Sequence, residues 1–204
     1  MTELVFLESI PMVSSIPMLL VALRIAIAPF LLWDSLDGQV GTGFLVAYVV
    51  AVLSDIFDGV IARRLGVSTA GLRQADSWAD RLLYVCIAIA AWLTHRDIIL
   101  AFQVPLLTVL GLQALWWVIN LVKYGQPACY HTYTAKAWGL SLLVATLMLF
   151  GASYGGWALG LAIALGIIHT LEEIAMTLIL PTWQHDIPSL FHAWKLRQQP
   201  SIQP

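Results

Sequence analysis

Apolar residues run along the chain in six long stretches, each separated from the next by a short polar segment. The stretches cover roughly residues 12–33, 42–63, 71–94, 97–123, 134–151 and 156–180. Each is about 18 residues or longer, close to what a helix needs to cross the hydrocarbon core of a bilayer. None shows the sustained alternation of apolar and polar residues that is typical of a strand. The pattern therefore predicts an all-α, polytopic membrane protein with a bundle of six transmembrane helices.

The composition also favours a membrane protein over a soluble one. Of the 204 residues, 60% are hydrophobic and 11% are charged, and the mean hydropathy is +0.83. Soluble proteins carry about 25% charged residues, so this chain has too few charges to cover a soluble surface. With 10 Lys and Arg and a net charge of −2, no basic tract points to nucleic acid. The short connections predict a single domain over residues 1–204.

Basic residues are distributed unevenly between the two ends of the predicted helices. If both termini are cytoplasmic, nine of the ten basic residues fall on the cytoplasmic side: Arg24, Arg63, Arg64, Arg73, Arg81, Lys123, Lys136, Lys195 and Arg197. This bias follows the positive-inside rule and predicts a cytoplasmic tail over residues 182–204. The mixture of apolar and basic side chains in that tail suits a short interfacial helix, and a loosely ordered tail is the alternative.

Four acidic residues lie inside the second and third predicted helices: Asp55, Asp58, Asp76 and Asp80. Charged residues within a membrane span are costly and are candidates for function. The first pair is three residues apart and the second pair four, so each pair shares one face of its helix. Gly59 and Ala62 fall on the same arc as the first pair and leave room for a ligand. A polar network that only joins the two helices is the alternative.

A bend near Val67 would bring the two acidic pairs level with each other. Asp58 lies nine residues before Val67 and Asp76 nine residues after it, and each helical residue rises about 1.5 Å. Gly66 is a suitable helix end, and Ser68 or Thr69 a suitable N-cap. Four carboxylates brought together need a counter-charge. Mg²⁺ or Mn²⁺ suits them because both prefer oxygen ligands.

The same segment resembles the signature of the CDP-alcohol phosphotransferase family, Asp-x2-Asp-Gly-x2-Ala-Arg-x8-Gly-x3-Asp-x3-Asp. The residues that match it are Asp55, Asp58, Gly59, Ala62, Arg63, Asp76 and Asp80. The second glycine stands at Gly71, one place early, and Leu72 occupies its position. The family's first helix often opens with Pro-Asn-x-x-Thr-x-x-Arg, which this chain resembles at Pro17 and Arg24 but not at the two polar positions between them.

The resemblance implies an enzyme of phospholipid synthesis. Such an enzyme transfers a phosphatidyl or related substituted phosphate group from a CDP-linked donor, such as CDP-diacylglycerol, to the hydroxyl of a small alcohol acceptor and releases CMP. The resemblance also implies two Mg²⁺ or Mn²⁺ ions per site, a homodimer, and an active site that faces the cytoplasm. We expect a bacterial inner membrane.

Roles for individual residues follow from the same resemblance. Asp80 would be the base that takes the proton from the acceptor hydroxyl, and the metal ligands would be Asp55, Asp58, Asp76 and Asp80. The donor contacts would be Asp55, Asp58, Gly59, Ala62, Arg63 and Gly71. Arg73 and Lys136 are candidates for binding the acceptor or a phosphate. Lys136 would serve equally as a topology anchor, and Arg73 and Arg81 could instead pair with the acids.

Further polar residues inside the spans have two interpretations each. Arg24 could pair with the acidic cluster or extend toward the membrane interface. His169, Glu172 and Glu173 could line an acceptor pocket or join helices through hydrogen bonds. The small residues Gly156, Gly160 and Ala164 lie at intervals of four, which suits either a dimer seam or packing inside the bundle.

Two other functions are compatible with intramembrane acids. An intramembrane prenyltransferase of the ubiquinone-pathway type also uses Asp-rich motifs and Mg²⁺, but it separates its motifs by a longer stretch than the 17 residues between Asp58 and Asp76. A divalent-cation carrier would need polar residues along a route across the membrane, whereas the acids of this chain cluster toward one face.

Overall fold

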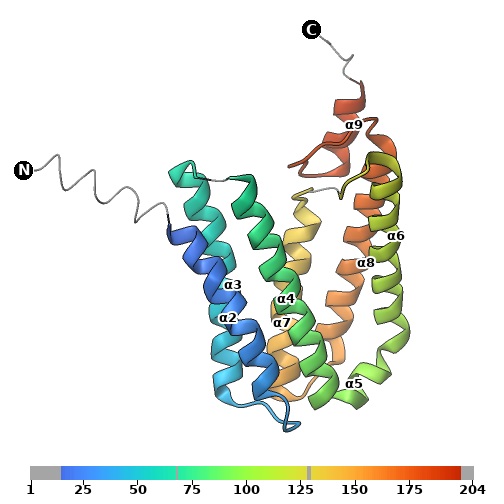
Figure 1. The fold of residues 1–204 in the computed structure, drawn as a ribbon. Helices are drawn as coiled ribbons and strands as arrows, with labels where there is room; N and C mark the ends of the chain where they lie inside the picture. The colour runs from blue at the N-terminus through green and yellow to red at the C-terminus, as the bar shows by residue number, and fades with distance from the viewer. Residues whose placement is uncertain (1–14, 68, 128–129, 199–204) are drawn as a thin grey trace, which may run out of the picture. The chain divides into compact units, whose positions relative to one another are not determined.

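A computed structural model of the protein describes residues 15–67, 69–127 and 130–198, apart from the side chains of Arg63, Ala70 and Arg73. Every regular element in these residues is a helix (Figure 1). The helices are α2 (Ile16–Asp34), α3 (Thr42–Leu65), α4 (Ala70–Thr94), α5 (Arg96–Ala101), α6 (Gln103–Tyr124), α7 (Tyr133–Ala152), α8 (Gly156–Ile179) and α9 (Leu190–Gln198). Six of them, α2, α3, α4, α6, α7 and α8, are long and apolar enough to cross a membrane. The predicted all-α fold with six spans is confirmed.

The chain divides into two compact units, Met1–Arg96 and Asp97–Pro204. In the first unit, α2 packs against both α3 and α4. In the second unit, α8 packs against α6, α7 and the short helix α9 (Figure 1). Each unit is therefore organised around one central helix.

Helix α2 buries a single stripe of residues. Its buried positions recur at intervals of four and three residues: Pro17, Val21, Arg24, Ala28 and Leu31. This spacing keeps them on one face of the helix, the face that packs on α3 and α4. Large apolar side chains such as Leu19 and Trp33 are exposed on α2. The one charged residue of the stripe, Arg24, is thus directed into the first unit.

The turn between α3 and α4 is short and well capped. Gly66 has a φ of +67°, a conformation that glycine adopts without steric cost. The Val67 amide donates to the Ala62 carbonyl at 3.0 Å, the bond expected of a Schellman motif at the end of a helix. The Thr69 hydroxyl accepts from the Leu72 amide at 3.2 Å and caps the start of α4. The predicted helix end at Gly66 and the predicted N-cap at Thr69 are confirmed; Ser68 lies outside the described residues.

The stretch 97–123 differs from the single helix that its hydropathy predicts. The structure has α5 and α6 instead, with an interruption at Phe102. Pro105 has no amide hydrogen to donate to the Ala101 carbonyl, and its ring crowds that carbonyl. The Phe102 amide donates to the carbonyls of Ile98 and Ile99 at 3.3 and 3.2 Å, so the last turn tightens before α6 begins. A hydropathy average does not register this break because proline sits inside an otherwise apolar run.

Small residues of α8 allow it to lie close to α7. Ala158 and Ala162 form a buried cluster with Ala145 of α7. One turn further along α8, a Cβ atom added to Gly166 would lie 2.8 Å from Trp138 Nε1. The buried row of small residues is thus Ala158, Ala162 and Gly166, whereas Ala164 is exposed.

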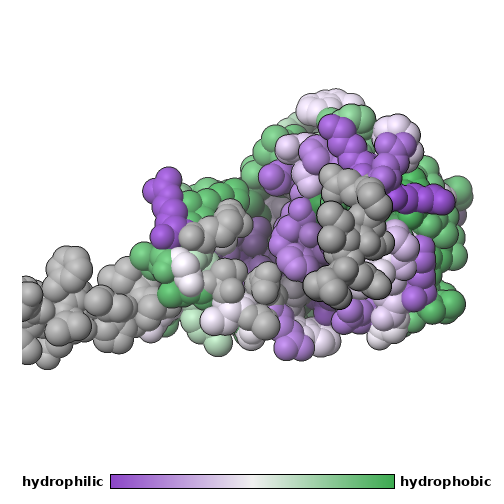
Figure 2. Space-filling view, turned by 90° about the horizontal axis from the view of Figure 1, so that it is seen from above, coloured by the Kyte–Doolittle hydropathy of each residue, from purple (hydrophilic) through white to green (hydrophobic). Residues whose placement is uncertain are grey.

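Exposed apolar side chains cover the spans. Val46, Leu107 and Val122 are 60%, 65% and 83% exposed, an arrangement that suits hydrocarbon better than water. Hydrophilic residues gather instead on the end of the second unit that carries α9, as Figure 2 shows in the view from above. The protein is a multi-pass membrane protein.

Replacement of Gly166 by alanine is expected to destabilise the second unit. The added methyl group would require the Trp138 ring to move, and overpacking of this kind costs about 1–3 kcal/mol. Gly160→Ala is the matched control, because its Cβ would lie 3.8 Å from Phe102 Cε1, an ordinary contact. Thermal melting of both variants in detergent tests this prediction, and equal melting temperatures would contradict it.

Candidate active site

Three helices of the first unit bring the intramembrane charges together. Helix α3 carries Asp55 and Asp58, and helix α4 carries Asp76 and Asp80 on the other side of the short turn. Both helices pack on α2, which contributes Arg24 from its buried stripe. The two acidic pairs therefore meet around a guanidinium group that belongs to a third helix.

Arg24 contacts all four carboxylates. Its Nη1 atom lies 3.1 Å from Asp55 Oδ1 and 2.9 Å from Asp76 Oδ1, and it also pairs with Asp80 Oδ1. Its Nη2 atom pairs with Asp58 Oδ2. Charge-assisted bonds of this kind satisfy groups that would otherwise be unfavourable in an apolar bundle. Of the two interpretations of Arg24, pairing with the acidic cluster is the one observed.

The four carboxylates differ in their access to the surroundings. The side chains of Asp55, Asp76 and Asp80 are 44%, 34% and 36% exposed, whereas that of Asp58 is 5% exposed and that of Arg24 is fully buried. The guanidinium group and Asp58 thus form the inner part of the cluster. The other three carboxylates form an open outer part that a ligand could reach.

The outer three carboxylates could hold a metal ion. One oxygen from each of Asp55, Asp76 and Asp80 lies within 4.8 Å of the other two. Carboxylate oxygens are the ligands that Mg²⁺ and Mn²⁺ prefer, and no histidine or cysteine among the described residues joins this group. The donor set therefore fits a hard divalent cation. Asp58 lies outside this triad, and its Oδ2 atom pairs with Nη2 of Arg24.

The remaining predicted donor contacts lie around the same bend. Ala62 is buried one turn after Asp58, and Gly59 is half-buried. Gly71 lies in the first turn of α4, where an added Cβ would meet no described atom within 4 Å. The side chains of Arg63 and Arg73 lie outside the described part of the chain.

Two further basic residues rest on aromatic rings. The Arg81 guanidinium lies 5.1 Å from the centre of the Trp78 ring. Lys136, in the second unit, is exposed, and its Nζ lies 5.6 Å from the centre of the Tyr133 ring. Such contacts are typical of basic side chains at a membrane interface.

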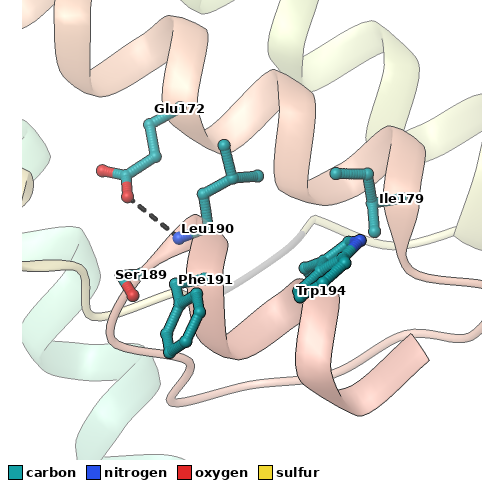
Figure 3. A pocket seen from close by; sticks show the side chains of 6 residues that line it. All are labelled: Glu172, Ile179, Ser189, Leu190, Phe191 and Trp194. Atoms are coloured by element: carbon teal, nitrogen blue, oxygen red, sulfur yellow. Dashed lines mark hydrogen bonds between the residues drawn. The ribbon is translucent and has the colours of Figure 1, made fainter. Parts of the chain in front are cut away.

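The polar residues of α8 connect the helices of the second unit. Glu172 accepts hydrogen bonds from the Thr134 hydroxyl at the start of α7 and from the Leu190 amide at the start of α9, the latter at 3.0 Å (Figure 3). Glu173 is buried, with its Oε2 atom 3.6 Å from His169 Nε2. The pair of Glu173 with His169 lies within α8, whereas His169 Nδ1 lies 3.3 Å from the Thr132 hydroxyl and 3.4 Å from the Thr134 hydroxyl at the start of α7. The contacts of His169 and Glu172 thus agree with the interpretation that these α8 residues join helices.

A pocket of about 550 Å³ opens between α8 and α9. Its walls are mostly apolar (Figure 3), and the residues that line it are Glu172, Ile179, Ser189, Leu190, Phe191 and Trp194. Helix α9 lies within the predicted tail 182–204. The bond from the Leu190 amide to Glu172 joins the start of α9 to α8 beside this pocket.

The loops that precede α7 and α9 meet at Asp186. Its carboxylate lies 2.6 Å from His131 Nδ1 and 2.8 Å from His185 Nδ1. Partial burial would raise the pKa of Asp186, but the hydrogen bonds and charges of the two histidines outweigh it and hold the pKa below its ordinary value. The Trp183 indole also donates to the Pro127 carbonyl at 3.0 Å. These contacts join the two loops to each other outside the membrane-spanning helices.

The sequence-based site residues did not include Arg24, although it is central to the cluster. A signal for its position was present in the chain. Arg24 shares its helix face with Val21, Ala28 and Leu31 at intervals of three and four, so it belongs to the packed stripe of α2. An intramembrane arginine pairs with acidic side chains or with backbone carbonyls, and α3 and α4 supply four carboxylates.

Comparison with known proteins agrees with this geometry. The sequence model of the CDP-alcohol phosphatidyltransferase family matches residues 14–168, a range that includes all three helices of the site. The chain is also 29% identical over 159 residues to a protein named cardiolipin synthase (CMP-forming) from Streptomyces coelicolor. That alignment covers 76% of this chain and 73% of the relative. No solved structure matches the chain.

The family match covers more than half of the chain and contains the four aspartates that the structure gathers around Arg24. The resemblance drawn from the signature is therefore confirmed. The chain is an enzyme, a membrane transferase of phospholipid synthesis that belongs to the CDP-alcohol phosphatidyltransferase family.

Proposed function

We propose that the protein transfers a phosphatidyl group from CDP-diacylglycerol to a hydroxyl acceptor and releases CMP. One observation carries the proposal: three partly exposed carboxylates from two helices converge within 4.8 Å, in a segment that the family model covers. A cluster of this kind would bind divalent cations and, through them, the diphosphate of the donor.

The site would hold two divalent ions, Mg²⁺ or Mn²⁺. Asp55, Asp76 and Asp80 offer the open oxygens, and the family signature adds Asp58. Bound cations would neutralise the charge of the diphosphate and clamp it for displacement. The donor's cytidine and phosphates would lie along Gly59, Ala62, Arg63 and Gly71, the other signature positions near the bend.

Asp80 would act as the general base. Its side chain is 36% exposed, so an acceptor hydroxyl could reach it. As the acceptor oxygen bonds to the phosphorus that carries the diacylglycerol, the proton of the hydroxyl passes to Asp80. The bond between that phosphorus and the bridging oxygen breaks, and CMP leaves with the electron pair. Base catalysis of this kind contributes about 10²–10⁴-fold to a rate.

The acceptor is proposed from the relative. That relative is named a CMP-forming cardiolipin synthase, and cardiolipin differs from phosphatidylglycerol by one phosphatidyl group. Phosphatidylglycerol is therefore the first acceptor to test. Arg73 and Lys136 are candidates for the phosphate of the acceptor. Glycerol phosphate, inositol phosphate and serine are the alternatives.

The proposed setting is a bacterial inner membrane with both termini in the cytoplasm. The distribution of nine of the ten basic residues supports this orientation. It would open the site to a water-soluble nucleotide at the cytoplasmic end of the spans, while the lipid part of the donor enters from the bilayer. The enzyme would act as a homodimer, as the family resemblance implies.

Purified protein in detergent is expected to release CMP from CDP-diacylglycerol when phosphatidylglycerol is present. Because the proposed ligands are carboxylates, activity should disappear after chelation with EDTA and return with Mg²⁺ or Mn²⁺. Radiolabelled donor and chromatography of CMP provide the measurement.

The same assay separates the alternatives. A panel of alcohols replaces phosphatidylglycerol one at a time, and the alcohol that supports CMP release identifies the acceptor. A prenyltransferase or a cation carrier would release no CMP with any alcohol. Full activity after exhaustive chelation would contradict the metal-dependent mechanism.

Asp80→Asn is expected to reduce turnover by about 10²-fold or more, because asparagine cannot take the proton from the acceptor. Donor binding, measured with the radiolabelled nucleotide, should remain substantial, since three carboxylates are left. Asp37→Asn is the matched control: Asp37 is exposed and accepts a hydrogen bond from the Gln39 amide, which asparagine can retain. Turnover of Asp80→Asn equal to that of the control would remove Asp80 from the role of base.

A further inference from the structure

The guanidinium group of Arg24 is in an unusual position for an intramembrane cation. It is fully buried, it lies on the central helix of its unit, and it contacts carboxylates from both neighbouring helices. Its Nε atom is buried and has no hydrogen-bond partner among the described residues. All of its bonding is therefore directed through Nη1 and Nη2 to the aspartates.

The two terminal nitrogen atoms of Arg24 contact different carboxylates. Nη1 lies against Asp55, Asp76 and Asp80, the three carboxylates that could hold a metal ion. Nη2 pairs with Asp58, which is nearly inaccessible. A divalent cation at the outer three carboxylates would compete with the positive charge at Nη1, whereas the pair with Asp58 could persist.

The charge balance of the cluster favours a resident cation among the carboxylates. Four ionised carboxylates and one guanidinium carry a net charge of −3, and without Arg24 the net charge would be −4. Carboxylate oxygens within 4.8 Å of one another repel strongly in a medium of low dielectric constant. A cation among these carboxylates therefore lowers the repulsion between α3 and α4 when no metal is bound.

We propose that Arg24 is a positioning residue that serves as the resident counter-charge of the metal site. Its guanidinium holds the four carboxylates together in the metal-free protein, and divalent cations replace the contacts of its Nη1 when they bind. The inference rests on the proposed function, since it requires that the outer carboxylates bind metal.

The proposal has two measurable consequences for a variant that lacks the charge. The metal-free protein should be less stable, because the carboxylates are left without a counter-charge. The affinity for metal should rise, because no fixed cation competes for the same oxygens. A residue with a purely structural role would produce the first effect without the second.

The test uses the full chain in detergent and two measurements. Melting temperatures are recorded in EDTA and in saturating Mn²⁺, and Mn²⁺ affinity is measured from the electron paramagnetic resonance signal of the free ion. The variants are Arg24→Gln, which removes the charge, and Arg24→Lys, which keeps it without the guanidinium fork. Arg64→Gln is the matched control, since Arg64 is exposed and lies on the same unit.

In EDTA, Arg24→Gln should melt about 5 °C or more below the wild type and the control. Saturating Mn²⁺ should remove most of this difference in melting temperature. Arg24→Gln should also bind Mn²⁺ about tenfold more tightly than the wild type. Arg24→Lys should lie between the two in both measurements. If Arg24→Gln folds only in the presence of Mn²⁺, this also supports the proposal. If Arg24→Gln does not fold at all, the same two measurements on Arg24→Lys test the proposal.

Two results would overturn the proposal, and they have different meanings. If wild type and both Arg24 variants bind Mn²⁺ with equal affinity and keep the same difference in melting temperature with and without it, Arg24 is only structural and the proposed function stands. If the wild type binds no Mn²⁺ and its melting temperature does not respond to the ion, the metal-dependent function itself fails, and this inference fails with it.

Discussion

The first unit depends on the neutralisation of charge in an apolar bundle. Four carboxylates on α3 and α4 are compatible with a membrane span because a buried guanidinium on α2 lies between them. The same ion pairs explain why α2 is the central helix of this unit, since it supplies the only cation among the described residues that contacts both acidic pairs. The same contacts therefore join the three helices and surround the candidate metal site.

Features determined by local residues could be predicted from the sequence. Gly66 and Thr69 mark the turn between α3 and α4 because a positive φ and an N-cap are properties of single residues. The convergence of Asp58 and Asp76 then follows from helix geometry. The central place of Arg24 depends on how α2 packs, which is a long-range contact. The interruption at Phe102 was missed because Pro105 lies in a stretch that hydropathy alone assigns to one helix.

The limits of prediction from sequence are clearer in the second unit. His169, Glu172 and Glu173 could be recognised as unusual for a span, but the sequence left their partners open. In the structure Glu172 reaches residues that precede it by 38 positions and follow it by 18. Loop residues far apart in the chain, such as His131 and Asp186, also come together only after folding. Contacts of this kind depend on the arrangement of whole helices rather than on any local pattern.

The brevity of the turn between α3 and α4 has a consequence for how this chain can vary. Only four residues separate Leu65, the last residue of α3, from Ala70, the first of α4. Each residue added to or removed from α4 ahead of Asp76 would rotate both acids of that helix by about 100° around its axis. A turn this short cannot rearrange to compensate for that rotation. Insertions and deletions are therefore tolerable in the longer loop between α2 and α3 but not in this segment, where chain length itself is a functional parameter.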